Sequence, residues 1–433
     1  MAEKTPTTPP PEQTGQGQPA PTHEESVRDS INKEIAVGSG VAISVIRLVN
    51  NLVENAAELR ASDIHIDPQD KDIRIRFRID GVLHDNYLFP KELHSEIITR
   101  IKVLSGMRTD EHQAAQDGRF KFLLPHGEGK NFDVRVSIAP TYFGENCVMR
   151  LLGETTQYFT LETLGFSPAN LEKIQRAMKK PYGLILATGP TGSGKTTTLY
   201  SILKELNTKE VSIITVEDPI EYSMVGIDQI QVNVRTGLTF AQGLRFILRQ
   251  DPNIIMVGEI RDNETAGIAV NAAMTGHMVL STLHTNDAAT TLPRLLDMQV
   301  EPFLISSTVN VAIGQRLVRK LCEECKVQKR LSPDELAVLG KGLPPGTLKG
   351  HTDFYIGVGC AKCDQSGFRG RIGIHEVLEI TEGIRTLIMT HANASEVHTA
   401  AVKEGMVPMV DDGLEKAFKG ITTVEEVLRV FHE

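Results

Sequence analysis

The segment Gly189–Thr196 reads GPTGSGKT and fits the pattern G-x-x-x-x-G-K-[ST] at every fixed position. The apolar run Leu184–Ala187 predicts a strand before it, and the residues after it predict a helix, which is the context that this motif requires. Such a loop wraps a phosphate with backbone N–H groups, while Lys195 reaches the β- and γ-phosphates and Thr196 binds Mg²⁺. The candidate nucleotide-binding residues are Gly189, Pro190, Thr191, Gly192, Ser193, Gly194, Lys195, Thr196 and Thr197.

Acidic residues follow two of the predicted buried strands. Glu217 and Glu221 come after VSIITV, and Glu259 comes after NIIMVG, with Gly258 where many ATPases have aspartate. Parallel strands place a ligand site at their carboxyl ends, and phosphoryl transfer needs acids for the metal and for the attacking water. We assign Glu259 to Mg²⁺ or its waters and Glu221 to the attacking water, although the two roles could be exchanged. A solvated strand end is the alternative for the acidic segment.

Two histidines flank the predicted strand MVLSTL. His284 follows its carboxyl end, where it is placed to sense a γ-phosphate by hydrogen bonding. His277 precedes the strand and is expected to act across a subunit contact or simply to pack. Six intervening residues exclude an H-x₃-H metal pair.

Four of the five cysteines form two C-x-x-C pairs, separated by 34 residues. Two such pairs suit a structural Zn²⁺ held by four thiolates, with no open position for a substrate. A thioredoxin-like redox pair is the alternative, but neither pair lies in a predicted βαβ unit. The candidate zinc ligands are Cys322, Cys325, Cys360 and Cys363, whereas Cys147 is expected to be a small buried hydrophobe.

The elements that must position these residues belong to more than one domain, because 433 residues exceed one ordinary core. Helices alternate with four buried apolar strands in the second half, which predicts a parallel sheet covered by helices. Earlier, apolar residues alternate with Arg74, Arg76 and Arg78, which predicts a half-buried strand whose arginines face solvent. The predicted segments are a disordered Pro/Thr/Gln-rich tail (1–25), a small mixed α/β domain (26–153), a linker (154–160) and a phosphate-loop domain (161–433) that includes a cysteine module (320–372) and a helical C-terminal region (380–433).

Composition limits the classes of function. The chain is 40% hydrophobic and carries a net charge of −9, which argues against broad binding to nucleic acid. It contains no run of 18 apolar residues and no basic–apolar–small signal pattern at its start. We therefore expect a cytoplasmic protein without a transmembrane segment, whose membrane roles would go through partners.

Five ordered segments of the chain resemble the secretion ATPase family, which contains type II secretion ATPases and type IV pilus assembly and retraction motors. The resemblance covers about residues 40–433 and is specific because the segments keep compatible spacing. It implies an α/β fold: a RecA-like ATPase domain preceded by a small PAS-like domain, with ATP near their junction. The segments are ASDIHIDP (61–68), the phosphate loop, TVEDPIEY (215–222), LRQDPNIIMVGEIRD (248–262) and TGHMVLSTLHTNDA (275–288).

The resemblance also assigns roles to arginines. Arg119 and Arg135 match arginines of the small domain that reach bound nucleotide. A surface guanidinium is the alternative for each one. The arginines that match ATPase-domain residues at phosphates or subunit interfaces are Arg245, Arg249, Arg261 and Arg294.

As the family resemblance implies, we expect a homo-hexamer that uses ATP with Mg²⁺ and acts on an inner-membrane platform protein. The four cysteines are typical of assembly-type members, whereas retraction motors usually lack them. Longer members carry a large extra N-terminal domain that we do not expect before residue 26, which leaves the cytoplasmic docking partner open. The competing functions are a retraction motor, a RecA-like nucleic-acid motor and a scaffold that binds nucleotide without hydrolysis. The sequence leaves open whether the fibre is a type II pseudopilus, a type IV pilus or a DNA-uptake pilus.

Overall fold

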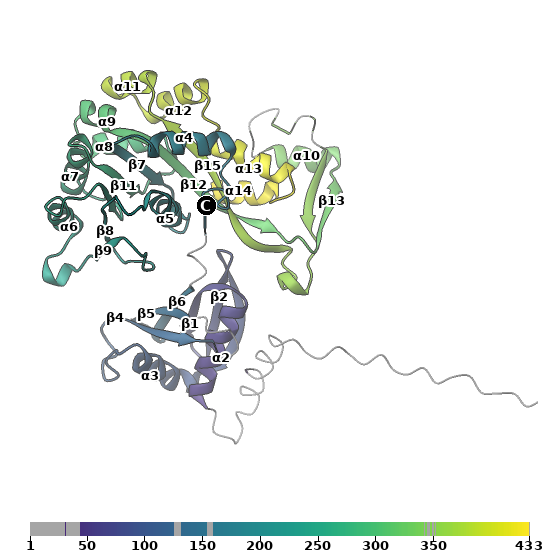
Figure 1. Ribbon diagram of the computed structural model, residues 1–433. Helices are drawn as coiled ribbons and strands as arrows, with labels where there is room; N and C mark the ends of the chain where they lie inside the picture. Colours follow the sequence, from purple (N-terminus) through teal and green to yellow (C-terminus); the bar gives the residue numbers. More distant parts are fainter. Residues whose placement is uncertain are drawn as a thin grey trace, which may run out of the picture. The chain divides into compact units, whose positions relative to one another are not determined.

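The computed structural model divides the chain into two compact units, 1–153 and 154–433 (Figure 1). The predicted disordered tail and residues 154–158 of the predicted linker lie outside the described residues. Residues 26–30 and 32–43 also lie outside the described residues. The described residues are 31, 44–124, 131–153, 159–341, 343, 347, 348, 350 and 352–432.

The small unit is a six-stranded antiparallel sheet in the order β3-β2-β1-β6-β5-β4, covered on one face by two helices. The helices contribute buried residues such as Leu48 and Ile101, which pack on sheet residues such as Ile64. The mixed α/β composition expected for this part of the chain is confirmed. The elements are α2 (Val45–Glu58), β1 (Ala61–Pro68), β2 (Asp72–Ile79), β3 (Val82–Pro90), η1 (Lys91–Leu93), α3 (His94–Leu104), β4 (Gln116–Leu123), β5 (Asn131–Thr141) and β6 (Gly144–Gly153).

The predicted alternation in β2 is confirmed, because Ile73, Ile75 and Phe77 are fully buried. The intervening arginines lie on the opposite face of the sheet, since side chains alternate along a strand. They do not merely face water, however, because each one forms an ion pair. The pairs are Arg74–Asp85 at 2.6 Å, Arg76–Asp67 at 2.7 Å and Arg78–Asp63 at 3.5 Å.

The large unit contains a seven-stranded sheet in the order β15-β12-β7-β11-β10-β8-β9. Every neighbouring pair is parallel except β12–β15, which is antiparallel. The four strands predicted from apolar runs are β7, β8, β10 and β11, and they form its centre. The strands are β7 (Gly183–Thr188), β8 (Ile213–Glu217), β9 (Asp228–Gln231), β10 (Ile254–Val257), β11 (Met278–Leu283), β12 (Val309–Leu321) and β15 (Phe368–Glu379).

Helices cover both faces of this sheet. In β7, Leu184 and Leu186 pack into one core with α7, whereas Ile185 and Ala187 pack into another core with α5. Burial on both faces explains why these strands read as continuous apolar runs. The helices are α4 (Pro168–Met178), α5 (Lys195–Leu206), η3 (Val234–Thr236), α6 (Phe240–Ile247), α7 (Asn263–Met274), α8 (Thr291–Asp297) and α9 (Pro302–Thr308).

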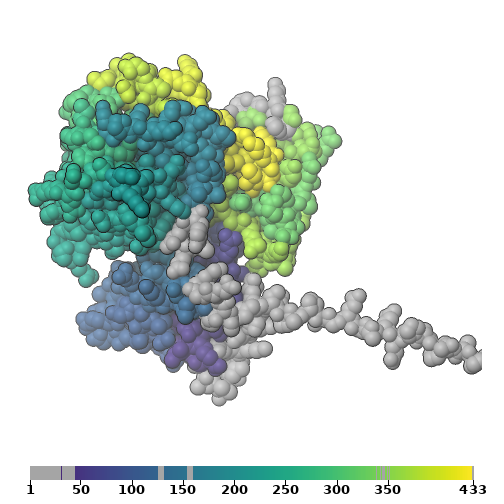
Figure 2. Space-filling view, in the orientation of Figure 1, coloured from purple at the N-terminus to yellow at the C-terminus, as the bar shows by residue number. Residues whose placement is uncertain are grey.

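Strands β12 and β15 continue beyond the sheet to the cysteine pairs and to a short antiparallel pair, β13 (Lys326–Arg330) and β14 (Asp353–Gly357). Figure 2 shows C-terminal helices in yellow between the body of this unit and the light green cysteine module. The helical C-terminal region is thereby confirmed. The remaining helices are α10 (Pro333–Gly340), η4 (Ala361–Cys363), α11 (Glu382–Met389), α12 (Ala394–Lys403), α13 (Met409–Phe418) and α14 (Val424–His432). None of the helices that the structure describes is long and apolar enough to cross a membrane.

Candidate functional site

The phosphate loop joins β7 to α5 and depends on glycines at defined places. Gly189, Gly192 and Gly194 have φ of +145°, +79° and +90°, a region that other residues rarely adopt. A Cβ atom on Gly189 would lie 2.4 Å from the carbonyl oxygen of Gln315 on β12. The turn therefore requires glycine, and it brings the loop to the first residue of α5, where helix N–H groups favour an anion.

Lys195 lies against the loop that it is predicted to serve. Its ammonium group donates hydrogen bonds to the carbonyl oxygens of Gly189 at 2.8 Å and Pro190 at 3.0 Å. Burial lowers the pKa of Lys195, and the negative charge of Glu259 opposes this shift. In the described structure, the buried hydroxyl of Ser193 has no hydrogen-bond partner. Such an orphaned donor beside a lysine fits a phosphate site.

Three predicted residues meet at the ends of β10 and β11. Oε2 of Glu259 lies 3.0 Å from Nε2 of His284 and 2.6 Å from Nε of Arg261. The Glu259 side chain is only 10% exposed, whereas those of Arg261 and His284 are 67% and 46% exposed. Phosphoryl transfer needs an acid for the metal and basic groups for the phosphoryl oxygens, and these three residues supply both.

Glu217 has different surroundings from those expected of a catalytic acid. It is 2% exposed, and its carboxylate accepts hydrogen bonds from the hydroxyls of Tyr200 and Thr215 and the amide of Gln229. Burial raises the pKa of Glu217, and these three hydrogen bonds oppose that rise. The Tyr200 hydroxyl also accepts the backbone N–H of Glu221 at 3.4 Å. Glu217 thus ties the acidic segment to α5, while Glu221 is partly exposed.

The other predicted residues of this unit have local partners. Arg245 on α6 pairs with Glu264 on α7 at 2.7 Å, and Arg249 lies 6.0 Å from the ring centre of Phe246. Nδ1 of His277 lies 2.9 Å from the carbonyl oxygen of Ala272, at the amino end of β11. The structure thus places His277 at the strand end away from His284. Arg294 is exposed on α8, and Thr196 and Thr197 are partly exposed on α5.

Sequence reasoning missed Gln315, which lies next to the phosphate loop. Its amide Nε2 donates to the carbonyl oxygen of Ser193 at 2.8 Å, and its Oε1 accepts from the Thr198 hydroxyl at 2.8 Å. Gln315 is only 2% exposed, and its main-chain oxygen packs at Gly189. No motif could reveal it, because it lies 122 residues after Ser193 and its side chain is chemically ordinary.

The four predicted cysteine ligands come together. Their sulfur atoms all lie within 4.8 Å of one another, and three of the distances are 3.8, 3.8 and 3.7 Å. Four thiolates bound to zinc at about 2.3 Å in a tetrahedron have sulfurs roughly 3.8 Å apart. The cluster therefore fits zinc. Cys147 lies apart from it in β6 and is fully buried, as predicted.

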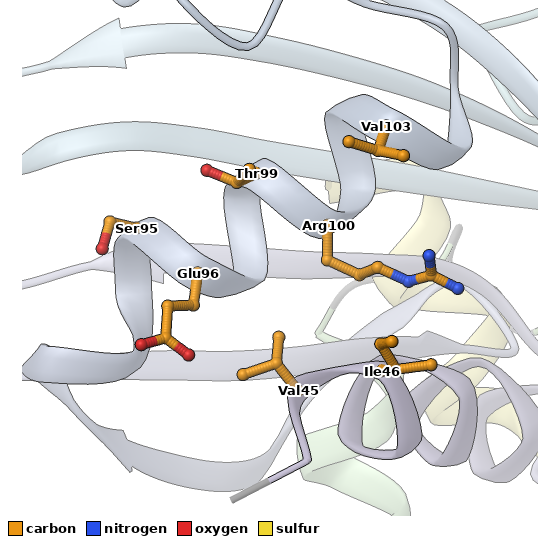
Figure 3. A pocket seen from close by; sticks show the side chains of 7 residues that line it. All are labelled: Val45, Ile46, Ser95, Glu96, Thr99, Arg100 and Val103. Carbon is orange, nitrogen blue, oxygen red and sulfur yellow. The ribbon is translucent and has the colours of Figure 1, made fainter.

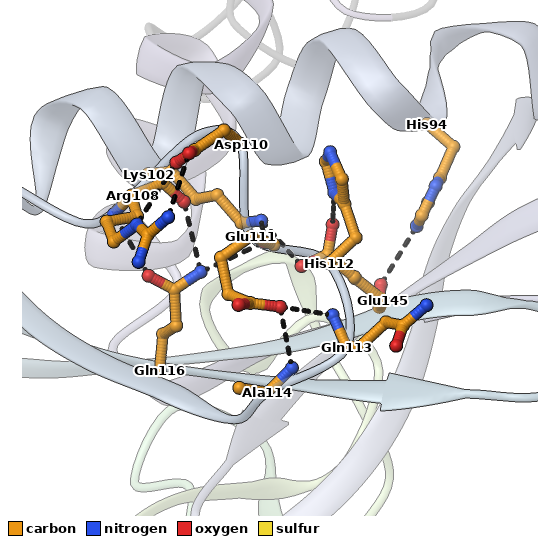
Figure 4. Close-up of polar contacts among 10 residues, drawn as sticks. All are labelled: His94, Lys102, Arg108, Asp110, Glu111, His112, Gln113, Ala114, Gln116 and Glu145. Carbon is orange, nitrogen blue, oxygen red and sulfur yellow. Dashed lines mark hydrogen bonds and ion pairs between the residues drawn. The ribbon is translucent and has the colours of Figure 1, made fainter.

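In the small unit, a buried ion pair fixes the segment that leads into the strand carrying Arg119 (Figure 4). The ammonium group of Lys102, which is 0% exposed, lies 2.6 Å from Oε1 of Glu145 and donates to the Glu111 carbonyl oxygen at 2.5 Å. The other oxygen of Glu145 lies 2.8 Å from Nδ1 of His112. Burial raises the pKa of Glu145, but His112 and Lys102 outweigh it, so the pKa is lowered overall. The segment that contains Glu111 and His112 is thus anchored to the body of the small unit by its contacts with Lys102 and Glu145.

The small unit also has an open groove of about 390 Å³ between α2 and α3 (Figure 3). Its walls include Ile46 and Val103, which are 54% and 57% exposed, together with Glu96 and Arg100. It contains none of the residues predicted for phosphate chemistry. The groove is therefore not the candidate active site.

Comparisons with known proteins agree on one family. Residues 41–429 match the family described as Type II/IV secretion system protein. The chain is 47% identical over 384 residues to the type IV pilus assembly ATPase PilB of Myxococcus xanthus. The matched region covers 89% of this chain and 67% of that protein. It is 45% identical over 390 residues to the type II secretion system protein E of Aeromonas hydrophila, with 90% and 76% covered. The match to PilB of Thermus thermophilus covers only 42% of that longer protein.

Solved structures support the fold. The pilus retraction motor PilT with bound ADP is 26% identical, with a TM-score of 0.59 over 88% of this chain and 96% of that one. The ATPase DotB of Legionella pneumophila is 24% identical, with a TM-score of 0.61 over 88% and 95%. Together with the parallel sheet, these likenesses confirm the expected α/β class with a RecA-like domain.

We expect Gln315→Leu to weaken ATP binding roughly tenfold or more. The change leaves the buried Ser193 carbonyl and Thr198 hydroxyl without partners, and each such loss costs roughly 1–3 kcal/mol. Titration with a fluorescent ATP analogue measures the effect. Gln328→Leu, at an exposed position on β13, is the matched control. Parent-like affinity in Gln315→Leu would contradict a role for Gln315 in shaping the loop.

We expect the purified chain to hold about one zinc ion, as a closed four-thiolate site does. Cys325→Ser should lose most of this metal and melt at a lower temperature, because the module has a small apolar core. Metal analysis and a thermal melt measure both effects, with Cys147→Ala as the control for loss of a buried thiol. A metal-free parent, or full zinc content in Cys325→Ser, would contradict the assignment.

Proposed function

Because the chain belongs to the Type II/IV secretion system protein family, as its five motifs predict, we propose that it is an ATPase that powers assembly of a pilus or pseudopilus. The single observation that carries the enzymatic part is the meeting of Glu259, His284 and Arg261 at strand ends that adjoin the phosphate loop. The relatives named above are assembly and secretion proteins at 45–47% identity. The retraction motor PilT is 26% identical, and the four-cysteine cluster also favours an assembly-type protein.

The phosphate loop binds ATP in this proposal. Lys195 exchanges its hydrogen bonds to loop carbonyl oxygens for bonds to the β- and γ-phosphates. Thr196 and Glu259 hold Mg²⁺, which neutralises phosphate charge when bound. Gln315 holds the loop backbone from the side of β12 through its hydrogen bond to Ser193. Glycine at position 189 allows the close approach of the two backbones, which keeps the loop in the conformation that phosphates need.

Glu221 is the better candidate for polarising the attacking water. Glu217 is enclosed by Tyr200, Thr215 and Gln229, so we propose that it positions the Glu221 segment rather than acting on water. Oε2 of Glu259 already pairs with Arg261 and His284. These contacts favour Glu259 as a carboxylate that holds the metal, and they leave the role of base to Glu221. In this proposal His284, next to Glu259, senses the γ-phosphate by a hydrogen bond.

We further propose that the active site is completed in a homo-hexamer. Transferring phosphoryl groups carry negative charge that extra cations stabilise when a site closes. Arg119 and Arg135 of the small domain (26–153) supply such cations, and Arg245, Arg249, Arg261 and Arg294 serve at phosphates or subunit contacts. The ATPase domain (161–433) contributes the phosphate loop, and residues 154–160 link the two domains. His277 belongs to a subunit contact in this scheme.

The mechanical output goes through partners. We propose that the protein works in the cytoplasm at the inner face of the membrane, on a platform protein and a cytoplasmic docking protein. The named relatives belong to pilus and secretion machines, which supports this location. The structural zinc keeps the cysteine module folded while the ring changes shape.

We expect Lys195→Ala to abolish ATP hydrolysis, because it removes the cation that contacts the β- and γ-phosphates. Phosphate release by the full-length chain measures this. Lys209→Ala, an exposed lysine after α5, is the matched control. Hydrolysis by Lys195→Ala at the parent rate would contradict the proposed ATPase.

We expect Glu221→Gln to bind ATP but to hydrolyse it roughly 100-fold more slowly or worse, since an amide cannot accept the proton of water. Nucleotide retention on an assembled ring and phosphate release are measured together, and Glu210→Gln at an exposed position is the control. Rapid turnover by Glu221→Gln would transfer the role of base to Glu259.

A further inference from the structure

Three neighbouring strands of the large sheet place Thr188, Gly314 and Glu376 in one row. The register pairs Gly314 on β12 with Thr188 on β7 and with Glu376 on β15. Paired residues project from the same face of a sheet, so Thr188 and Glu376 lie on one face with only a glycine between them. On the other side of β7 is β11, whose last residue pairs with Thr188. The segment 284–288, which begins with His284, therefore starts beside this row.

Thr188 holds the beginning of this segment. It is 0% exposed and directly precedes the phosphate loop. Its hydroxyl accepts the N–H of Thr285 at 3.1 Å and donates to the carbonyl oxygen of the same residue at 3.0 Å. Because Thr285 follows His284, these two hydrogen bonds fix the backbone beside the histidine.

Glu376 holds the end of the same segment. Its Oε1 accepts the N–H of Ala288 at 2.6 Å, and its Oε2 accepts the N–H of Met409, the first residue of α13, at 3.3 Å. Glu376 is 3% exposed, and it forms no ion pair with any lysine, arginine or histidine that the structure describes. Burying a carboxylate costs free energy unless hydrogen bonds compensate it, so these two N–H groups are what stabilise it there.

Gly314 leaves the space through which Glu376 reaches the segment. A Cβ atom at this position would lie 2.9 Å from Cγ and from Oε1 of Glu376, and 3.0 Å from the backbone nitrogen of Ala288. Its φ is outside the left-handed region, so the close approach, and not the backbone conformation, requires glycine here. The carboxylate thus crosses β12 where a larger residue would block its contact with Ala288.

We propose that Glu376 is a positioning residue of the ATPase site, which acts by holding the end of the segment 284–288 that carries His284. The inference rests on the proposed function, in which His284 senses the γ-phosphate. Thr188 and Glu376 restrain the two ends of the segment, so the histidine keeps its place when it meets a phosphate. Loss of the Glu376 contact releases one end. The imidazole, whose Nε2 lies 3.0 Å from Oε2 of Glu259, is then no longer fixed relative to that carboxylate.

This role separates catalysis from ATP binding. Glu376 bonds to Ala288 and Met409, whereas Lys195 and Gln315 make the hydrogen bonds to the phosphate loop itself. A variant of Glu376 should therefore lose kcat and keep its affinity for ATP, because an interaction made in the transition state alone changes kcat.

The experiment measures phosphate release and the binding of a fluorescent ATP analogue by the full-length chain. We expect Glu376→Leu, which removes both acceptors, to lower kcat about 20-fold, and Glu376→Gln, which keeps one acceptor oxygen, to lower it about fivefold. ATP affinity should stay within about twofold of the parent in both. Glu376→Gln keeps the test decisive if Glu376→Leu fails to fold. Glu379→Gln, on the same strand but paired with Arg176 on α4, is the control and should match the parent.

A double-mutant cycle tests whether Glu376 acts through His284. We expect Glu376→Gln to lower kcat by less than about twofold in the His284→Ala background, because the group that it positions is already absent. A full fivefold loss in that background overturns the proposal. Parent-like kcat in His284→Ala alone also overturns it, since Glu376 would then have no sensing group to position.

A purely structural contact gives a different pattern. Glu376→Gln would then melt at a lower temperature but keep the parent kcat below melting, and this result overturns the proposal. A loss of ATP affinity as large as the loss of kcat overturns it as well, because Glu376 would then support the phosphate loop. In each of these cases an inactive Lys195→Ala leaves the proposed ATPase standing. If Lys195→Ala hydrolyses ATP at the parent rate, the proposed function fails, and the role of Glu376 fails with it.

Discussion

The close approach of β12 to the phosphate loop is the contact on which the site of the large unit depends. Gln315 touches the loop through its main-chain oxygen at Gly189 and through its side chain at Ser193 and Thr198. Its neighbour Gly314 pairs with Thr188, the last residue of β7. These contacts fix the backbone of the loop from the side of β12. Such preorganisation lowers the cost of binding a charged ligand.

The sequence predicted the parts of this site whose requirements are local. Glycines at positive φ, the lysine and the preceding apolar strand lie within about a dozen residues, so their spacing alone predicts the loop. Gln315 and the Tyr200–Glu217–Gln229 network could not be predicted in that way, because their contacts join distant segments. An acid at a strand end has the same appearance in a sequence whether it faces a ligand or a buried tyrosine. The structure distinguishes Glu217 from Glu259 by their partners, because Glu217 is enclosed by neutral hydrogen-bond donors whereas Glu259 contacts Arg261 and His284.

The small unit shows the same limit in its charges. Period-2 alternation predicted which face Arg74, Arg76 and Arg78 occupy, but not that each one meets an aspartate. Which residues are opposite one another depends on the register of the strands, and a slip by one residue would turn every side chain to the other face. Apolar residues such as Ile64 and Met149 must face the helices, and this requirement sets the register. The register that places Arg150 on β6 opposite Arg135 on β5, and Arg135 opposite Arg119 on β4, is therefore a consequence of core packing on the opposite face.

Strands β12 and β15 connect the phosphate loop with the cysteine module. Gln315 lies in the middle of β12, and Cys322 directly follows the carboxyl end of this strand, where its N–H donates to the Gly367 carbonyl oxygen at 3.0 Å. The cysteine spacing predicted the four-cysteine cluster, but the connection to the loop follows only from the strand pairing. The cysteine cluster, which fits zinc, lies at one end of a strand pair whose middle contacts the phosphate loop. Because β12 and β15 pair along most of their length, the cysteine module is joined directly to the strand that contacts the loop and is not an independent appendage.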